Sequence, residues 1–175
     1  EIEHPLALQI GGSDPKLLAE ATKIGVDWGY DEINLNVGCP SSRVSSGDFG
    51  AVLMKRKDHV AKCVDAMAQF SSNVPISVKC RIAVDDQDPE EILPSFIKTV
   101  SNSGVSIFII HARKAILSGL STKDNRKIPP IDYNLVKKIK VQFPKLEICL
   151  NGEIKDLSSV NNFINDGMDG CMIGR

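Results

Sequence analysis

Short strand-like segments alternate with helix-period segments along the whole chain, and this alternation constrains the fold more than any other feature. The strand-like segments are rich in β-branched and apolar residues and lie at 6–10, 33–37, 76–82, 106–112, 146–150 and 171–173. Between them apolar residues recur at spacings of three and four, as in the stripe of Val60, Val64, Met67 and Phe70. The pattern predicts an α/β fold with a mainly parallel sheet. Three of the expected helices are followed by a glycine suited to a left-handed cap: Gly25, Gly104 and Gly167.

Polar residues at the ends of the strands distinguish between the two architectures that this pattern allows. An open doubly wound sheet gathers its chemistry at one switch point, whereas a (β/α)8 barrel aims every strand at one mouth. Here nearly every strand ends in polar or reactive residues: Gln9, Asn36, Cys39, Lys79, Arg81, His111, Arg113, Asn151, Gly174 and Arg175. The distribution favours a TIM barrel. Residues 1–175 would form about six of its eight strands, without the first strands and the closing helix.

Composition excludes several other classes of protein. Of the 175 residues, 42% are hydrophobic and 25% charged, which is ordinary for one domain with a core. The longest apolar runs are too short to cross a bilayer, and no leader segment is expected. Five cysteines without C-x-x-C spacing suggest neither a metal site nor disulfides, so a reducing compartment is expected. A net charge of -1 provides no global attraction for nucleic acid, so an RNA partner would need a local basic patch.

Strand periodicity places the candidate side chains on shared faces. Residues two apart point the same way, so Lys79 shares a face with Arg81, and His111 shares one with Arg113. A lysine within a strand is costly to bury alone, so Lys79 either reaches the rim, pairs with a carboxylate, or is held against an anionic cofactor or intermediate. For His111, a structural donor and a functional group remain equally open.

Two further features suggest a ligand. Glycines in "LNGEIKDL" and "MIGR" follow the last two strands, where barrels commonly bind phosphate, although tight turns explain them equally well. Basic residues gather in the segment after the histidine strand, either as a solvated surface or as a grip for a polyanion: Arg113, Lys114, Lys123, Arg126 and Lys127.

Cys39 is the most specific candidate for chemistry. It lies between Gly38 and Pro40 at the end of a strand, and Gly47 and Gly50 would let its loop act as a lid. The four other cysteines are expected to be inert apolar residues. No histidine nearby in the sequence would activate the thiol, so general acid and nucleophile both remain open.

Several of these segments together resemble the tRNA-dihydrouridine synthase family, in particular its DusA branch. The resemblance is carried by "EINLNVGCPSSRVSSGDFGAVLM", "VKCRIAVDDQD", "FIIHARKAILSGLS", "KDNRKIPPIDY" and "LNGEIKDL", in order and with family-like spacing. It implies an FMN-binding TIM barrel in which NADPH reduces the flavin. The flavin then reduces the C5–C6 bond of a uridine in the tRNA D-loop, at position 20 or 20a, and a cysteine protonates C5.

The resemblance also implies roles for individual residues. Cys39 matches the proton donor. Flavin contacts are implied for Gln9, Lys79, His111, Asn151, Gly152, Glu153, Gly174 and Arg175. Contacts to tRNA are implied for Asn36, Lys123 and Arg126, and face parity adds Arg81 and Arg113 as uracil or phosphate ligands. The expected protein is a monomer that works without a metal or membrane, in the cytoplasm or an organelle.

Departures from the family pattern leave alternatives open. Glu153 stands where the family typically has a second glycine, beside the expected phosphate. The C-terminal helical tRNA-binding domain would lie outside residues 1–175, so these residues alone are expected to bind FMN poorly and to reduce no tRNA. One alternative is a flavin dehydrogenase of the dihydropyrimidine or dihydroorotate type. The other is a truncated RNA-binding remnant without catalysis.

Overall fold

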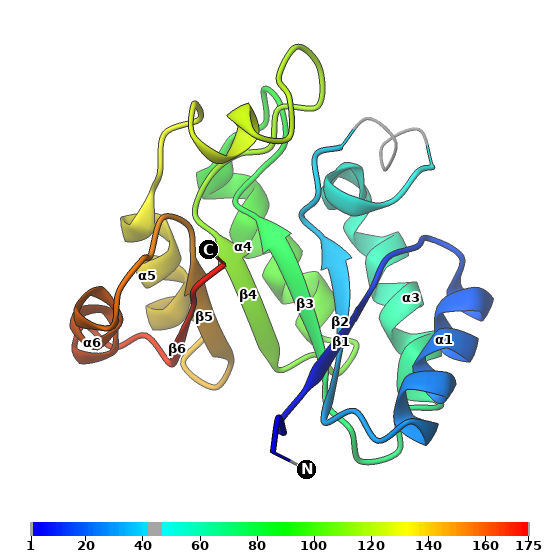
Figure 1. Ribbon diagram of the computed structural model, residues 1–175. Helices are drawn as coiled ribbons and strands as arrows, with labels where there is room; N and C mark the ends of the chain where they lie inside the picture. Colours follow the sequence, from blue (N-terminus) through cyan, green and yellow to red (C-terminus); the bar gives the residue numbers. More distant parts are fainter. Residues whose placement is uncertain (1, 42–46, 175) are drawn as a thin grey trace.

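Six parallel strands form one sheet in the order of the sequence. The computed structural model describes residues 2–41 and 47–174. The strands are β1 (Ala7–Ile10), β2 (Glu32–Val37), β3 (Ile76–Arg81), β4 (Ile107–His111), β5 (Glu147–Asn151) and β6 (Gly170–Met172), and each is parallel to the next (Figure 1). The strand order never reverses, so the sheet has no switch point. A sequential parallel sheet with its helices on the outer face is the wall of a (β/α)8 barrel, and this confirms the predicted fold class.

Aspartate side chains fix where four of the helices begin. The helical segments are α1 (Pro15–Asp27), η1 (Gly50–Arg56), α3 (Lys57–Ala68), α4 (Pro89–Ser101), η2 (Asp124–Arg126), α5 (Tyr133–Gln142) and α6 (Leu157–Asn165). The residues before α1, α4, α5 and α6 each accept hydrogen bonds from backbone N–H groups of the first turn: Asp14, Asp88, Asp132 and Asp156. Such caps satisfy donors that a helix leaves unpaired at its start.

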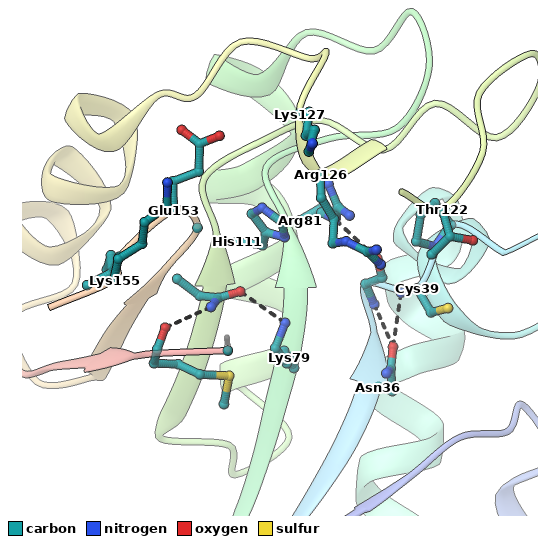
Figure 2. Close-up of a pocket in the computed structure, with 17 residues that line it drawn as sticks. Asn36, Cys39, Lys79, Arg81, His111, Thr122, Arg126, Lys127, Glu153 and Lys155 are labelled. Atoms are coloured by element: carbon teal, nitrogen blue, oxygen red, sulfur yellow. Dashed lines mark hydrogen bonds between the residues drawn. The ribbon is translucent and has the colours of Figure 1, made fainter. Parts of the chain in front are cut away.

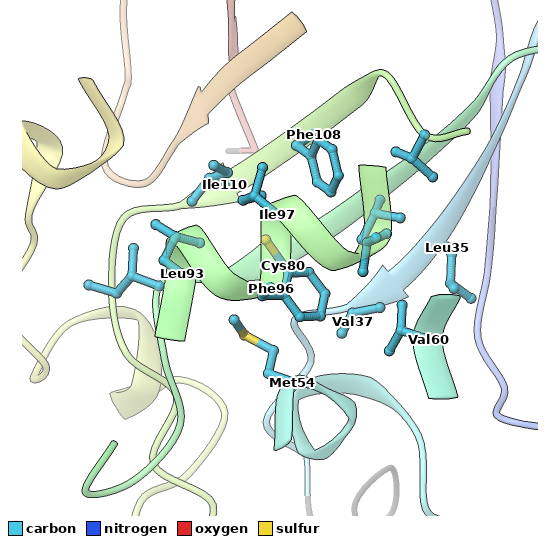
Figure 3. Close-up of a cluster of buried hydrophobic side chains, with 14 of the residues drawn as sticks. Leu35, Val37, Met54, Val60, Cys80, Leu93, Phe96, Ile97, Phe108 and Ile110 are labelled. Atoms are coloured by element: carbon cyan, nitrogen blue, oxygen red, sulfur yellow. The ribbon is translucent and has the colours of Figure 1, made fainter. Parts of the chain in front are cut away.

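The core lies between the helices and the outer face of the sheet. Alternate residues of the central strands, including Val37, Cys80 and Phe108, are fully buried against α3 and α4 (Figure 3). The predicted stripe of α3 is confirmed for Val60, Val64 and Met67. Phe70 is an exception: it lies beyond the end of α3 and remains 45% exposed.

Two of the three predicted helix-capping glycines are confirmed. Gly104 and Gly167 follow their helices with φ of +95° and +93°. The prediction for Gly25 is wrong, because this residue lies inside α1. A Cβ there would lie 2.6 Å from Ile33 Cδ1 and 2.8 Å from Leu8 Cδ2, so Gly25 is needed for the close approach of α1 to the sheet. Gly29, with φ of +82°, adopts the left-handed conformation after this helix.

The register of the sheet brings the polar strand ends together on the inner face. Asn36 lies beside Lys79, Arg81 beside His111, and His111 beside Asn151. In the described part of the chain no helix is long and apolar enough to cross a membrane. The same residues hold no group of three or more His, Cys, Asp or Glu side chains placed to bind a metal ion.

Candidate functional site

A pocket of about 560 Å³ opens at the carboxyl ends of the strands. Its wall includes ten of the candidate residues from the sequence: Asn36, Cys39, Lys79, Arg81, His111, Arg126, Asn151, Gly152, Glu153 and Gly174. Cys39 lies on one side and Glu153 on the other, with Lys79 and His111 between them (Figure 2). The prediction that the strand ends meet at one mouth is therefore confirmed for these residues.

The remaining candidates lie elsewhere. Gln9 borders a smaller neighbouring hollow of about 140 Å³, which Asn36 and Cys39 also line. Arg113 and Lys123 do not line the pocket, and Arg175 lies outside the described residues.

The backbone around Cys39 is anchored from both sides. The Oδ1 atom of Asn36 accepts hydrogen bonds from the N–H groups of Gly38 and Cys39, each at 3.0 Å. The carbonyl of Cys39 accepts from the N–H of Ala51 at 2.9 Å, while its side chain stays partly exposed in the pocket. The predicted lid at Gly47 and Gly50 includes residues 42–46, which lie outside the described residues, and it stays a prediction. The cysteine itself is held in place by an Asx turn, the short-range motif in which an Asn side chain caps its own loop.

A network of hydrogen-bonded polar side chains holds the side chain of Asn36 in place. Asn36 Nδ2 donates to Gln9 Oε1 at 2.9 Å, and Gln9 Nε2 donates to Asn34 Oδ1 at 2.7 Å. Asn34 then donates to the hydroxyl of Ser77 at 2.6 Å, and Ser77 donates to Glu32. Because every member has a partner, the network fixes the amide orientation of Asn36.

Lys79 is held by an amide instead of a carboxylate. Its Nζ donates to Asn151 Oδ1 at 3.2 Å, and Asn151 Nδ2 donates to the Met172 carbonyl at 2.9 Å. No acidic side chain among residues 2–41 and 47–174 forms a salt bridge with Lys79. Burial, and then the charge of Arg81, lower the pKa of Lys79. The site therefore contains a partly buried amine that lacks an anionic partner of its own, as expected of a ligand for a negative group.

His111 is neutral at physiological pH. Burial lowers its pKa to about 3, and the positive charges of Arg81 and Lys79 add to this effect. A neutral imidazole can donate one hydrogen bond and accept another, which suits a polar contact to a ring carbonyl or nitrogen better than a charge pair.

This shift of the His111 pKa predicts loss of stability in mild acid. Between pH about 6.5 and about 3, the histidine of the unfolded chain binds a proton that His111 of the folded protein does not bind, so the free energy of unfolding falls as the pH is lowered through this range. The free energy of unfolding of the full-length protein should fall over this window. His111→Gln should flatten that part of the curve, as measured by urea unfolding at a series of pH values. Equal slopes for the two proteins would contradict the assignment.

Gly152 is required by both its backbone and its neighbours. It has φ of +121°, and a Cβ would lie 2.9 Å from His111 Cδ2 and 3.1 Å from Ile131 Cδ1. The phenol of Tyr133 donates to the carbonyl of Gly152 at 2.6 Å, which holds the turn in place.

Gly152→Ala should therefore displace His111 and destabilise the protein by about 1–3 kcal/mol. Chemical unfolding measures the loss. Gly174→Ala is the matched control, because the nearest atom to its Cβ, Asn151 Nδ2, is 4.0 Å away. Equal stability of the two variants would show that the close contact at Gly152 relaxes without cost.

Glu153 turns its carboxylate to Arg113. Its Oε1 lies 2.8 Å from Arg113 Nη2, and Arg113 also donates to the Pro129 carbonyl. Glu153 has φ of +53°, in the left-handed region that glycine adopts without strain. In this structure the Arg113 guanidinium is engaged by Glu153 and Pro129 outside the pocket wall. Direct contact of Arg113 with a ligand stays an untested prediction.

Arg126 has a buried hydrogen-bond donor without a partner among the described residues. This donor is its Nε, although the side chain lines the pocket. Such atoms are rare in proteins and are found where a ligand or water completes the bonding.

Three more polar side chains of the pocket wall were not among the predicted site residues: Thr122, Lys127 and Lys155. Thr122 and Lys127 lie in the basic segment, and Lys155 lies in "LNGEIKDL". Nothing in their spacing indicates that they reach the pocket. Lys127 and Lys155 add to the basic side chains Lys79, Arg81 and Arg126, and Glu153 is the one acidic side chain of the wall within the part of the chain that the structure describes.

Searches with the structure find enzymes with barrel folds. Morphinone reductase superposes with a TM-score of 0.65 at 12% identity, covering 90% of this chain and 43% of that one. A 2,3-dimethylmalate lyase superposes with a TM-score of 0.58 at 12% identity, covering 99% of this chain and 58% of the other. At such identities the likeness shows the fold alone.

Comparison of the sequence with known proteins identifies the family. A tRNA-dihydrouridine(20/20a) synthase of Escherichia coli O6:H1 is 55% identical over 176 residues, covering 100% of this chain and 53% of the relative. That of Shewanella oneidensis is 53% identical over 173 residues, covering 99% of this chain and 51% of the relative. The chain thus spans about half the length of these relatives. The model of the family "Dihydrouridine synthase (Dus)" matches residues 1–175, and the chain belongs to this family.

Proposed function

We propose that the protein reduces the C5–C6 double bond of a uridine at position 20 or 20a in the tRNA D-loop, as a tRNA-dihydrouridine synthase. The observation that carries the proposal is the meeting of Cys39, Lys79 and His111 with Arg126 and Lys127 in one pocket. The first three are the groups that reduction of a uracil ring would use. The other two are cations from the segment suited to a nucleic acid.

The residues of the pocket fit FMN as the cofactor, with NADPH as its reductant. Reduced flavin supplies a hydride when it is bound. Lys79 would lie against the negative charge of the reduced ring and His111 against a ring polar atom, since protein charges near a flavin tune it in this way. Gly152 and Gly174 lie where the loops after the last two strands commonly hold phosphate, and Lys155 lines the same side of the pocket.

Cys39 would deliver the proton to C5 of the uracil. Its backbone is fixed through Asn36 and Ala51, so the thiol meets the substrate without having to be ordered. His111 lies beside Lys79, away from Cys39, and so is not placed to activate the thiol as a nucleophile, which favours a role as general acid. Protonation at C5 completes the reduction, because a hydride added at C6 leaves a negative charge that C5 must share.

The basic residues would hold the tRNA as the target base leaves its stack. A base in a loop is extruded at a cost of a few kcal/mol, less than a base in a duplex. Arg126, Lys127 and Lys123 would bind phosphates or the uracil edge, with the unpartnered Nε of Arg126 as the most direct candidate. We propose a monomer that works without a metal, in the cytoplasm or in an organelle that carries tRNA.

The test uses the full-length protein with NADPH, FMN and unmodified tRNA, and measures dihydrouridine by mass spectrometry of the digested RNA. Formation of dihydrouridine at position 20 or 20a is expected. Reduction of free uracil or oxidation of dihydroorotate with untouched tRNA would favour a small-molecule dehydrogenase. Binding of tRNA with no reduction of either substrate would favour a non-catalytic RNA-binding protein.

A further inference from the structure

The buried guanidinium of Arg81 joins two loops of the site that are far apart in the sequence, the loop of Cys39 and the loop of Lys123 and Arg126. Arg81 ends β3 and is 3% exposed. Its Nε donates to the carbonyl of Gly38 at 3.2 Å, directly before Cys39. Its Nη1 donates to the carbonyls of Lys114 at 3.2 Å and Asn125 at 2.9 Å. Both carbonyls belong to the basic loop, which we define as residues 114–128.

Asn125 makes the basic loop a rigid partner for Arg81. The side chain is fully buried, and its Oδ1 accepts from the N–H of Ile116 at 2.7 Å. Its Nδ2 donates to the carbonyl of Ile116 at 2.8 Å and also reaches those of Leu120 and Ser121. The Asn125 side chain thus holds together both ends of the basic loop, while the backbone carbonyl of Asn125 accepts a hydrogen bond from Arg81. Lys123 and Arg126 lie on either side of Asn125 in the sequence.

The bonds of Arg81 differ from those of a ligand-binding arginine. Two of its three nitrogens bind three backbone carbonyls, and no carboxylate forms a salt bridge with it within the described ranges. The carbonyl dipoles of two loops compensate its charge. Removing the guanidinium would leave these buried carbonyls without a donor, which costs more than an ordinary hydrogen bond.

We infer that Arg81 is a positioning residue that couples the Cys39 loop to the basic loop, with Asn125 as its counterpart. A displacement of the basic loop moves the backbone carbonyls of Lys114 and Asn125. Because the Arg81 guanidinium is bound to these carbonyls, it moves with them and shifts the carbonyl of Gly38, which directly precedes Cys39. Through this coupling, a nucleic acid bound to the basic loop sets the position of the thiol. The roles of Cys39 and of the basic loop rest on the proposed function, but the mechanical coupling does not.

The test measures how fast N-ethylmaleimide labels Cys39 in the full-length protein, read by mass spectrometry of the Cys39 peptide. Asn125→Ala changes no group that contacts Cys39 in the structure. It should nevertheless speed labelling roughly fivefold, the factor equivalent to one net hydrogen bond. Arg81→Met should speed it similarly. Because both act through one connection, the double variant should label no faster than Arg81→Met alone.

Controls separate coupling from general loosening. Val100→Ala removes buried volume from α4, which ends at the opposite end of the strands, and should leave Cys39 labelling unchanged despite lower stability. Where Arg81→Met does not fold, as judged by circular dichroism, Arg81→Lys takes its place in the same cycle. Any of three results would overturn the coupling. The Asn125→Ala variant could be labelled at the wild-type rate, or the effects of the two substitutions could multiply in the double variant. The Val100→Ala variant could also be labelled as fast as Asn125→Ala. Failure of the wild type to form dihydrouridine would refute the proposed function and leave this cycle interpretable.

Discussion

Cys39→Ala in the full-length protein should lower the rate of dihydrouridine formation in tRNA by roughly 100- to 10,000-fold, the usual contribution of a positioned general acid. The reason is the geometry of the thiol, whose backbone is fixed from both sides while its side chain faces the pocket. Alanine fits the same backbone, so neither the loop nor the protein should unfold. The measurement is single-turnover formation of dihydrouridine with pre-reduced enzyme.

Two further measurements make this result decisive. Oxidation of NADPH by the flavin should be unchanged in Cys39→Ala, because the cysteine takes no part in that half-reaction. Cys149→Ala is the matched control, a partly exposed thiol whose pKa burial raises to about 12 and which does not line the pocket. Wild-type rates in Cys39→Ala would remove the cysteine from the mechanism.

Replacing Lys123 and Arg126 together by alanine should weaken tRNA binding strongly and make it less dependent on salt. Each lost phosphate contact reduces the slope of log K against log salt by about 0.7 to 0.9, so the pair should reduce it by roughly 1.4 to 1.8. Arg126 should account for the larger part of the affinity, since its side chain lines the pocket and its Nε lacks a partner among the described residues. Filter binding at several salt concentrations measures both quantities.

The control for this pair removes the same charge elsewhere. Lys62 and Lys98 are exposed on α3 and α4, on the outer face of the sheet, and their double alanine variant should keep the wild-type slope. NADPH oxidation by the flavin should survive in both double variants. If the Lys123 and Arg126 variant loses this activity as well, misfolding of the basic loop explains the result better than lost contacts.

The parts of the fold that depend on neighbours in sequence could be predicted from it. A period of two along β3 places Lys79 and Arg81 on one face and Val78 and Cys80 on the other, and the structure agrees. Polar strand ends predict a common mouth because parallel strands all point the same way. Local spacing also finds the stripe of α3 as far as Met67.

What could not be predicted depends on contacts between distant residues. Arg81 meets Asn125 across 44 positions, and no local pattern shows that its guanidinium binds carbonyls. Face parity alone suggested a ligand contact for Arg81 and for Arg113, and such a contact stays a prediction for both. It did not reveal that Arg81 binds backbone carbonyls or that Arg113 pairs with Glu153. Gly25 was misread for a related reason: its contact with Ile33 depends on how α1 approaches the sheet, which the helix sequence does not reveal.

The alternation along β3 has a consequence for how this protein can change over time. The strand Ile76–Arg81 contributes to two parts of the protein. Val78 and Cys80 belong to the hydrophobic core, and Lys79 and Arg81, on the other face, line the pocket. A substitution touches one of these and leaves the other intact. Insertion or loss of a single residue within the strand would exchange them, turning lysine and arginine into the core and cysteine and valine into the pocket. Length within this strand is therefore under stricter constraint than identity at any one of its positions.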